Sequence, residues 1–292
     1  MTAAFDELIE VVAHRGMGSA FVMPDEPPEN TLPSFEAAWI AGSDACEIDV
    51  HLTRDNQVVG IHDATTGRTS DVDLEVSRHT LAELQQIDVG HWKGERWGGS
   101  RIPLLSDVLS TVPEGHRLFV EIKTGPEIVS SLANAIRDSG RFFNEVVIIS
   151  FNPESLKESK VVLPDLRHFL LVEFELDSLN GEWKAGVAQS NPGTREVERL
   201  WQQPADIPQL VDAVRQHGFD GLDVSAAQPD NFFGEMQAAG IEWMVWTVDN
   251  PDVAVEVANR GATSITTNRL LAITQALQTH GFRTGPASRR GC

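Results

Sequence analysis

Short hydrophobic runs rich in β-branched residues alternate with longer amphipathic segments along most of the chain. The short runs are typical of buried strands, and a period near 3.6 residues is typical of helices. The predicted strands are Val11–Ala13, Ala45–Val50, Leu118–Ile122, Val146–Ser150, Arg167–Val172, Gly221–Val224, Met244–Val248 and Ser264–Thr266.

A predicted helix follows each of these strands, which is the pattern of βαβ units and a parallel sheet. Eight such units favour an α/β fold of the closed (β/α)8 TIM-barrel type, although an open doubly wound sheet has the same local pattern. The predicted helices are Leu32–Ala41, Leu104–Val112, Glu127–Ser139, Pro153–Val161, Ile207–His217, Pro229–Ala239, Pro251–Asn259 and Leu270–His280.

The run Val58–Ile61 also looks like a strand, but it follows the second predicted strand too closely for a parallel crossover. We therefore predict an antiparallel hairpin that turns near Asp55 and Asn56. This hairpin would return the chain to the carboxyl end of the barrel and place His62 there. Active sites of such barrels lie at that end.

The regular alternation stops in two places, and we interpret the chain as one domain of residues 1–292 with irregular additions. A small insertion between the second strand and the second helix, at about residues 65–103, contains a helical piece at Thr80–Gln86. A second irregular stretch is expected at Glu173–Ala205. The polar tail at residues 283–292 is expected to be frayed.

Carboxylates recur on the inner face of two predicted strands. Glu47 and Asp49 are two residues apart and share one face of a strand, and Glu121 and Lys123 repeat this arrangement on the next barrel strand. Three inward carboxylates are oxygen ligands of the kind that Mg²⁺ and Ca²⁺ prefer. A salt-bridge network in which Lys123 and Arg15 balance the acids is an equally good interpretation.

Two histidines end short apolar runs at the same predicted rim. His14 and His62 could act as general base and general acid, although a lone histidine at a strand end is more often structural. His51 is expected to point away from Asp49.

Arg15 follows His14 and suits bidentate contact with a phosphate, or an ion pair with Glu29 or Glu47. Trp246 is expected to face inward, where it could flank a substrate or simply fill the core.

Composition limits the classes of partner. The chain has 292 residues, 41% of them hydrophobic, and a formal net charge of -20 without a cluster of Lys and Arg, so no nucleic acid partner is expected. Cys46 and Cys292 form neither a zinc pattern nor a disulfide framework. No secretory signal or membrane span is seen, so we expect a cytoplasmic protein without stable membrane insertion.

Taken in order, several short motifs resemble those of the glycerophosphodiester phosphodiesterase family, which is related to the phosphatidylinositol-specific phospholipase C barrels. Each motif is weakly specific, but their joint order and spacing are strongly specific, and together they cover nearly the whole chain. They are Ala13–Gly16, Pro28–Thr31, Glu47–Val50, His62-Asp63, Val120–Lys123, Ser150-Phe151, Trp246–Val248 and Ile265–Asn268.

The resemblance implies an enzyme that hydrolyses small glycerophosphodiesters to sn-glycerol 3-phosphate and an alcohol such as choline or ethanolamine. It implies one divalent cation, Mg²⁺ or Ca²⁺, and an acid/base pair of histidines. In this chain the implied metal ligands are Glu47, Asp49 and Glu121, the histidines are His14 and His62, the phosphate ligands are Arg15 and Lys123, and Glu29 orders the site.

The chain departs from the family pattern in the longer loop Met17–Pro27, in Asn268 where the family often has Asp, and in Glu173–Ala205. One alternative is a lysophospholipid phosphodiesterase on the same barrel, with loop residues Phe21, Val22, Met23 and Trp183 lining an apolar channel. Another is a noncatalytic module that binds phosphate esters. The sequence leaves the oligomeric state, the head group and the choice of cation open.

Overall fold

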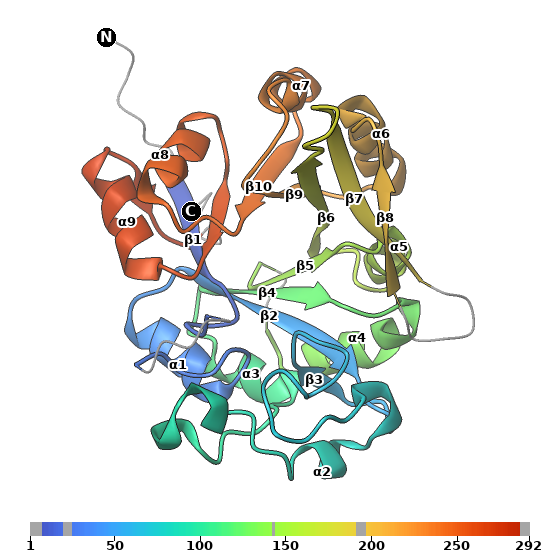
Figure 1. Cartoon of the computed structure of the whole chain (residues 1–292), viewed down its shortest axis with the longest axis vertical. Helices are drawn as coiled ribbons and strands as arrows, with labels where there is room; N and C mark the ends of the chain where they lie inside the picture. The colour runs from blue at the N-terminus through green and yellow to red at the C-terminus, as the bar shows by residue number, and fades with distance from the viewer. Residues whose placement is uncertain (1–7, 20–24, 142–143, 191–196, 287–292) are drawn as a thin grey trace.

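A closed barrel of eight parallel strands forms the centre of the computed structural model, which describes residues 8–19, 25–141, 144–190 and 197–286 (Figure 1). Strand β1 pairs in parallel with both β2 and β11, and this pairing closes the sheet. The predicted (β/α)8 fold is therefore confirmed. In order around the barrel the strands are β1 (Leu8–Ala13), β2 (Ala45–Leu52), β4 (Arg117–Ile122), β5 (Val146–Ser150), β6 (Arg167–Leu176), β9 (Gly221–Ser225), β10 (Glu242–Trp246) and β11 (Ser264–Thr267).

Helices surround the barrel, and local sequence signals set their ends. Asn152, Asp206 and Asn250 accept backbone N–H bonds at the starts of three helices, each of which has a proline in its first turn. Gly218 and Gly240 follow the ends of helices 207–217 and 232–239 in the left-handed conformation. The helices are α1 (Leu32–Ile40), α3 (Leu105–Thr111), α4 (Val129–Asp138) preceded by η4 (Pro126–Ile128), α5 (Pro153–Val162), α6 (Ile207–His217), α7 (Phe232–Ala239), α8 (Pro251–Asn259) and α9 (Leu270–Thr279).

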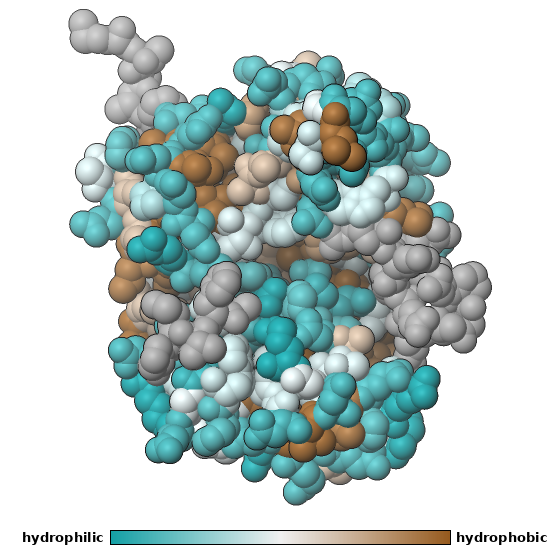
Figure 2. All heavy atoms as spheres, in the orientation of Figure 1, coloured by the Kyte–Doolittle hydropathy of each residue, from teal (hydrophilic) through white to brown (hydrophobic). Residues whose placement is uncertain are grey.

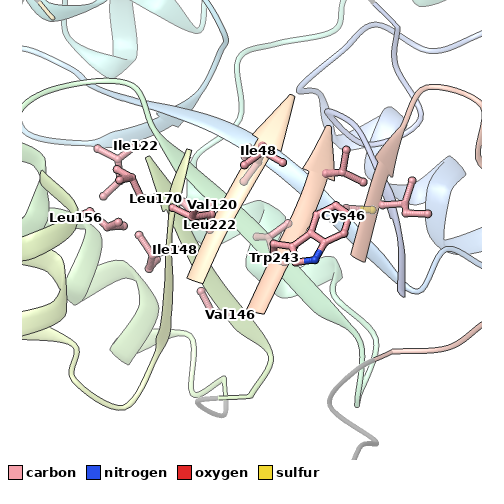
Figure 3. Packing of buried hydrophobic residues seen from close by; sticks show 14 of the residues in the cluster. Cys46, Ile48, Val120, Ile122, Val146, Ile148, Leu156, Leu170, Leu222 and Trp243 are labelled. Carbon is pink, nitrogen blue, oxygen red and sulfur yellow. The ribbon is translucent and has the colours of Figure 1, made fainter. Parts of the chain in front are cut away.

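Side chains alternate between the inside of the barrel and the layer under the helices. Cys46, Ile48 and Val50 belong to the large cluster between strands and helices, part of which is shown in Figure 3. This is the outward orientation that the alternation predicts. The interior of the barrel holds a smaller apolar cluster. It consists of Val12, Ala45, Phe119, Val147, Ile149, Phe169, Leu171 and Met244.

The predicted hairpin and insertion are present. Strand β3 (Val58–Gly60) runs antiparallel to β2, and Asn56 in the turn between them has a φ of 59°. The insertion that follows has its own apolar cluster, which includes Val76, Leu84 and Ile102. It lies at the lower edge of Figure 1 and contains η1 (Val76–Arg78), α2 (Leu81–Leu84), η2 (His91–Lys93) and η3 (Glu95–Trp97).

The stretch Glu173–Ala205 is more regular than predicted. Strand β6 continues beyond the barrel to Leu176, and β7 (Trp183–Ser190) and β8 (Val197–Gln202) add to it as antiparallel strands at the upper right of Figure 1. The prediction of an irregular loop there was wrong, because backbone pairing with the extended β6 organises a segment whose own hydrophobic pattern is weak.

The chain end also differs from expectation where it is described. Strand β12 (Arg283–Thr284) pairs in parallel with Leu8 and Ile9 of β1, whereas fraying was predicted from residue 283 onward. Residues 287–292 of that predicted tail lie outside the described residues.

The face of the molecule in Figure 2 is mostly hydrophilic, and hydrophobic side chains appear on it in separate patches. In the part of the chain that the structure describes, none of the helices has the length and apolar character needed to cross a membrane.

Candidate active site

A pocket of about 190 Å³ opens at the carboxyl ends of the barrel strands. Polar groups from β2, β4 and the segments that follow β1, β3 and β4 face a mixture of apolar and polar side chains from the opposite strands. The pocket is lined by His14, Arg15, Glu47, His62, Glu121, Lys123, Ile149, Phe151, Leu171, Glu173, Asp223, Trp246, Thr247 and Thr266. The alternation along the strands points the strand residues of this set inward, and the parallel direction of the strands brings the set to the carboxyl end of the barrel.

Three carboxylates converge beside this pocket. Glu47 and Asp49 lie on β2, Asp49 pairs in register with Glu121 of β4, and one oxygen of each carboxylate lies within 4.8 Å of the others. Lys123 Nζ lies 2.8 Å from Glu121 Oε1 and 3.5 Å from Asp49 Oδ1. The predicted acid cluster and the predicted salt bridges thus occur together.

These salt bridges leave two oxygens of the acid cluster without a hydrogen bond, although Lys123 lies 3.5 Å from one of them, Asp49 Oδ1. Glu47 Oε1 and Asp49 Oδ1 are buried and have no hydrogen-bond partner. Burial, Asp49 and Glu121 raise the pKa of Glu47 well above its usual range. Burial acts in the same direction on Asp49, but Arg15 and Lys123 hold its pKa well below the usual range. Unpartnered buried carboxylate oxygens fit a bound hard cation.

Arg15 is held by a backbone turn that only a narrow set of residues permits. Its φ is 54° and that of Gly16 is 73°, and a Cβ on Gly16 would lie 2.7 Å from the backbone carbon of Ser34. The Arg15 backbone N–H donates to Glu47 Oε2 at 2.8 Å. Its guanidinium lies 2.8 Å from Glu29 Oε1 and 3.3 Å from Asp49 Oδ2, so the ion pair with Glu29 is present while Arg15 also lines the pocket.

Glu29 joins the first loop to the insertion. Arg68 Nη1 and Nη2 donate to its two oxygens at 2.8 and 2.7 Å, and Arg68 also pairs with Asp63. Burial disfavours the ionised form, but the bonds from Arg68 and the charge of Arg15 lower the pKa of Glu29 overall. Sequence reasoning assigned Glu29 to the site but missed Arg68, which lies in the insertion without a recognisable motif.

His14 has a fixed orientation. Its Nδ1 lies 2.9 Å from Asn268 Oδ1, and Asn268 Nδ2 donates to Asp249 Oδ2 at 2.9 Å. Because the amide nitrogen of Asn268 faces a carboxylate, its oxygen faces His14 and accepts from Nδ1–H. His14 Nε2 then carries the lone pair, 3.9 Å from Glu47 Oε2. Burial and the charge of Arg15 lower the pKa of His14 to about 4.

His62 is oriented by its neighbour in sequence. Its Nδ1 lies 2.6 Å from Asp63 Oδ1, and its backbone oxygen lies 3.1 Å from His51 Nε2. The expectation that His51 points away from Asp49 was wrong, because residues two apart on a strand share a face. Burial lowers the pKa of His51 to about 4.

The opposite side of the pocket carries both apolar and polar side chains. Trp246 and Phe151 make an edge-to-face contact with ring centroids 5.4 Å apart, and Trp246 therefore faces inward as predicted. Asp223 is the carboxyl group on β9 that lines this side, and sequence reasoning missed it because it is a single acid within an apolar strand. Trp183 packs against the outer cluster and does not line the pocket. Phe21, Val22 and Met23 lie outside the described residues.

Comparison with known proteins gives the family. The model of the glycerophosphoryl diester phosphodiesterase family matches residues 14–272. The chain belongs to this family. A glycerophosphodiester phosphodiesterase of Caldanaerobacter subterraneus subsp. tengcongensis is 30% identical over 259 residues, which cover 86% of this chain and 98% of that relative. The protein is accordingly an enzyme of the phosphoric diester hydrolase class.

Solved structures of glycerophosphodiester phosphodiesterases share the fold. A phosphodiesterase of Oleispira antarctica, solved with the product sn-glycerol-3-phosphate, has a TM-score of 0.75 at 23% identity, and the match covers 93% of this chain and 97% of the other. A glycerophosphodiester phosphodiesterase of Agrobacterium tumefaciens has a TM-score of 0.68 at 23% identity, with 92% and 100% covered.

Proposed function

We propose that this protein hydrolyses small glycerophosphodiesters to sn-glycerol 3-phosphate and an alcohol, with a divalent cation and two histidines. The observation that carries the proposal is that both histidines and two cationic side chains line one pocket, beside which three carboxylates converge. The complex of the Oleispira antarctica phosphodiesterase with sn-glycerol-3-phosphate supports this class of product.

Glu47, Asp49 and Glu121 would hold the cation, Mg²⁺ or Ca²⁺, because they form the group of acids within the described residues that could share one ion. When bound, such an ion neutralises charge on a phosphodiester and polarises its oxygens. Arg15 and Lys123 line the same pocket and are placed to bind phosphate oxygens, since both retain their positive charge among the acids.

The hydrogen bonds of the two histidines indicate which one accepts a proton and which one donates a proton. His14 presents the Nε2 lone pair because Asn268 accepts from its Nδ1–H, so we assign His14 the role of proton acceptor. His62 Nδ1 is bonded to the Asp63 carboxylate, which fixes the ring with Nε2 as its other nitrogen, so we assign His62 the role of proton donor to the departing alcohol. Each proton transfer is worth roughly 10² to 10⁴ in rate.

The test is release of sn-glycerol 3-phosphate from glycerophosphocholine, measured before and after treatment with a chelator and after addition of Mg²⁺ or Ca²⁺. We expect activity to disappear with the chelator and to return with a cation. Full activity in the chelator would contradict the metal assignment, and absence of any release would contradict the function.

A second measurement separates the histidines from the scaffold. His14→Ala and His62→Ala should each lower kcat by roughly 10² to 10⁴ while binding of sn-glycerol 3-phosphate persists. Retained turnover in His14→Ala would refute the acid/base assignment. Binding of the product without turnover by the unaltered protein would instead favour the noncatalytic module.

A further inference from the structure

A buried carboxyl group lies across the barrel from the acid cluster. Asp223 is on β9, which is four strands from β2 in either direction around the barrel. Its relative exposure is 1%, it lines the pocket, and its Oδ1 has no hydrogen-bond partner. Asp223 is not one of the three acids that could share a cation.

The surroundings of Asp223 give no structural reason for an acid. Its neighbours in register are Leu171 on β6 and Met244 on β10, both in the apolar interior cluster. Among the ion pairs of the described residues none involves Asp223. The charged group that acts on the pKa of Asp223 is Glu121, which has the same sign of charge. A buried polar group in such a place costs stability unless something hydrogen bonds to it.

The charges of the pocket decide which part of a substrate can reach Asp223. Arg15 and Lys123 lie just after β1 and β4, on the side of the acid cluster, so the phosphate belongs there. A carboxyl group on the opposite wall accepts a hydrogen bond from an alcohol hydroxyl whether or not it is protonated, and in its ionised form it also repels a phosphate.

The wall around Asp223 is held in place. Trp246 Nε1 donates to the Asp223 backbone oxygen at 3.2 Å, and the Trp246 ring packs edge-to-face against Phe151. The carboxyl group is therefore a preorganised acceptor in a wall that also carries Glu173 and Thr247 at the pocket.

We infer that Asp223 is a specificity residue that accepts a hydrogen bond from a free hydroxyl of the glycerol moiety, an inference that rests on the proposed function. A site built to hydrogen bond a substrate hydroxyl discriminates strongly against an analogue that lacks it, because the buried group is then left unpaired. Asp223 thus selects glycerol diesters over simple alkyl diesters.

The test compares two substrates with the same leaving group. Choline release is measured from glycerophosphocholine and from ethyl phosphocholine, which lacks both free hydroxyls. We expect the unaltered protein to prefer glycerophosphocholine, and Asp223→Ala to lower kcat/KM for it by roughly 10- to 100-fold. The loss for ethyl phosphocholine should be at least about tenfold smaller, so that the preference largely disappears.

Stability measurements separate this role from a structural one. Asp223→Ala should unfold at an unchanged or higher temperature, because it removes an unsatisfied buried carboxyl group. Asp223→Asn keeps an acceptor oxygen and should retain part of the preference. Asp220→Asn is the matched control: Asp220 accepts bonds from Lys160 and the His168 backbone, so this change should lower Tm and leave the preference intact.

Three results would overturn the inference. In the first, Asp223→Ala leaves glycerophosphocholine hydrolysis at the level of the unaltered protein. In the second, it lowers kcat/KM equally for both substrates, which would indicate a general or structural role. The third is absence of choline release from glycerophosphocholine by the unaltered protein, which overturns the proposed function and the inference with it. The first two results leave the proposed function standing.

Discussion

A single amide determines which nitrogen of His14 faces the pocket. Asn268 donates two hydrogen bonds to Asp249. One comes from its side-chain nitrogen, and the other from its backbone nitrogen, which lies 2.8 Å from Asp249 Oδ1. The amide therefore cannot turn over without losing a bond to a carboxylate. An aspartate at this position would hold the same nitrogen with a charged acceptor and favour the imidazolium form.

We expect Asn268→Leu to lower kcat by roughly 10- to 100-fold with little change in KM, because partners that orient a functional group have effects of this size. Steady-state kinetics on glycerophosphocholine measure it. Asn268→Asp is the control, and it should keep more activity than Asn268→Leu because it still accepts from His14. Equal kinetics for Asn268→Leu and the unaltered protein would show that His14 needs no such support.

At this scale, the sequence was informative where residues formed a pattern. Glu47 and Asp49 were placed correctly because their spacing of two on a strand leaves one orientation, and His14 and His62 because apolar runs end at them. Asp223 and Arg68 could not be found, since each is a single charged residue that only the closed barrel or the insertion brings to the site.

At the scale of elements, a buried histidine joins α5 to β6. His168 Nε2 lies 3.0 Å from Ser159 Oγ of α5, and Nδ1 lies 3.0 Å from the Leu166 oxygen. Burial is the main cause that lowers the pKa of His168 to about 4 from 6.5. The folded protein therefore binds fewer protons than the unfolded chain between these values, and stability is lost as the pH falls from about 6.5 toward 4.

We predict that His168→Gln makes the free energy of unfolding less dependent on pH. The unaltered protein should lose about 2 kcal/mol more than the variant between pH 7 and pH 5. Urea unfolding at both pH values measures the difference. His280→Gln is the matched control, because His280 is exposed and directly follows helix α9. Parallel pH profiles for His168→Gln and the unaltered protein would contradict the prediction.

Elements with strong periodicity were predicted to within a few residues, and those that depend on pairing were not. Strand β10 begins at Glu242, two residues before its predicted start, because its register with β9 pairs Glu242 with Gly221. Strand β7 contains Ala185, Gly186 and Ala188, whose small side chains give little strand pattern. Backbone pairing with β6 therefore stabilises β7 as a strand, although its local sequence does not predict one.

At the scale of the whole molecule, the acid cluster adds to a formal net charge of -20. A divalent cation would offset local repulsion among three carboxylates that two cationic side chains only partly neutralise. The folded protein should therefore bind the cation better than the unfolded chain, and binding should stabilise the fold.

We expect Mg²⁺ or Ca²⁺ to raise Tm, with a gain of roughly 3 kcal/mol in the free energy of unfolding at 100 times the dissociation constant. Thermal unfolding with increasing cation measures this without any substrate. Glu47→Gln should weaken the response strongly, and Glu36→Gln, at an exposed position on α1, should preserve it. An identical response in Glu47→Gln would place the cation elsewhere.

The closure of the barrel through β1 has a consequence for biosynthesis. One edge of β1 pairs with β2, close by in sequence, whereas the other pairs with β11, so that Val12 lies beside Thr266. A ribosome must therefore deliver nearly the entire chain before the first strand acquires its second neighbour. Until then the nascent protein exposes an open strand edge, and chaperones that shield such edges would be most needed during this interval.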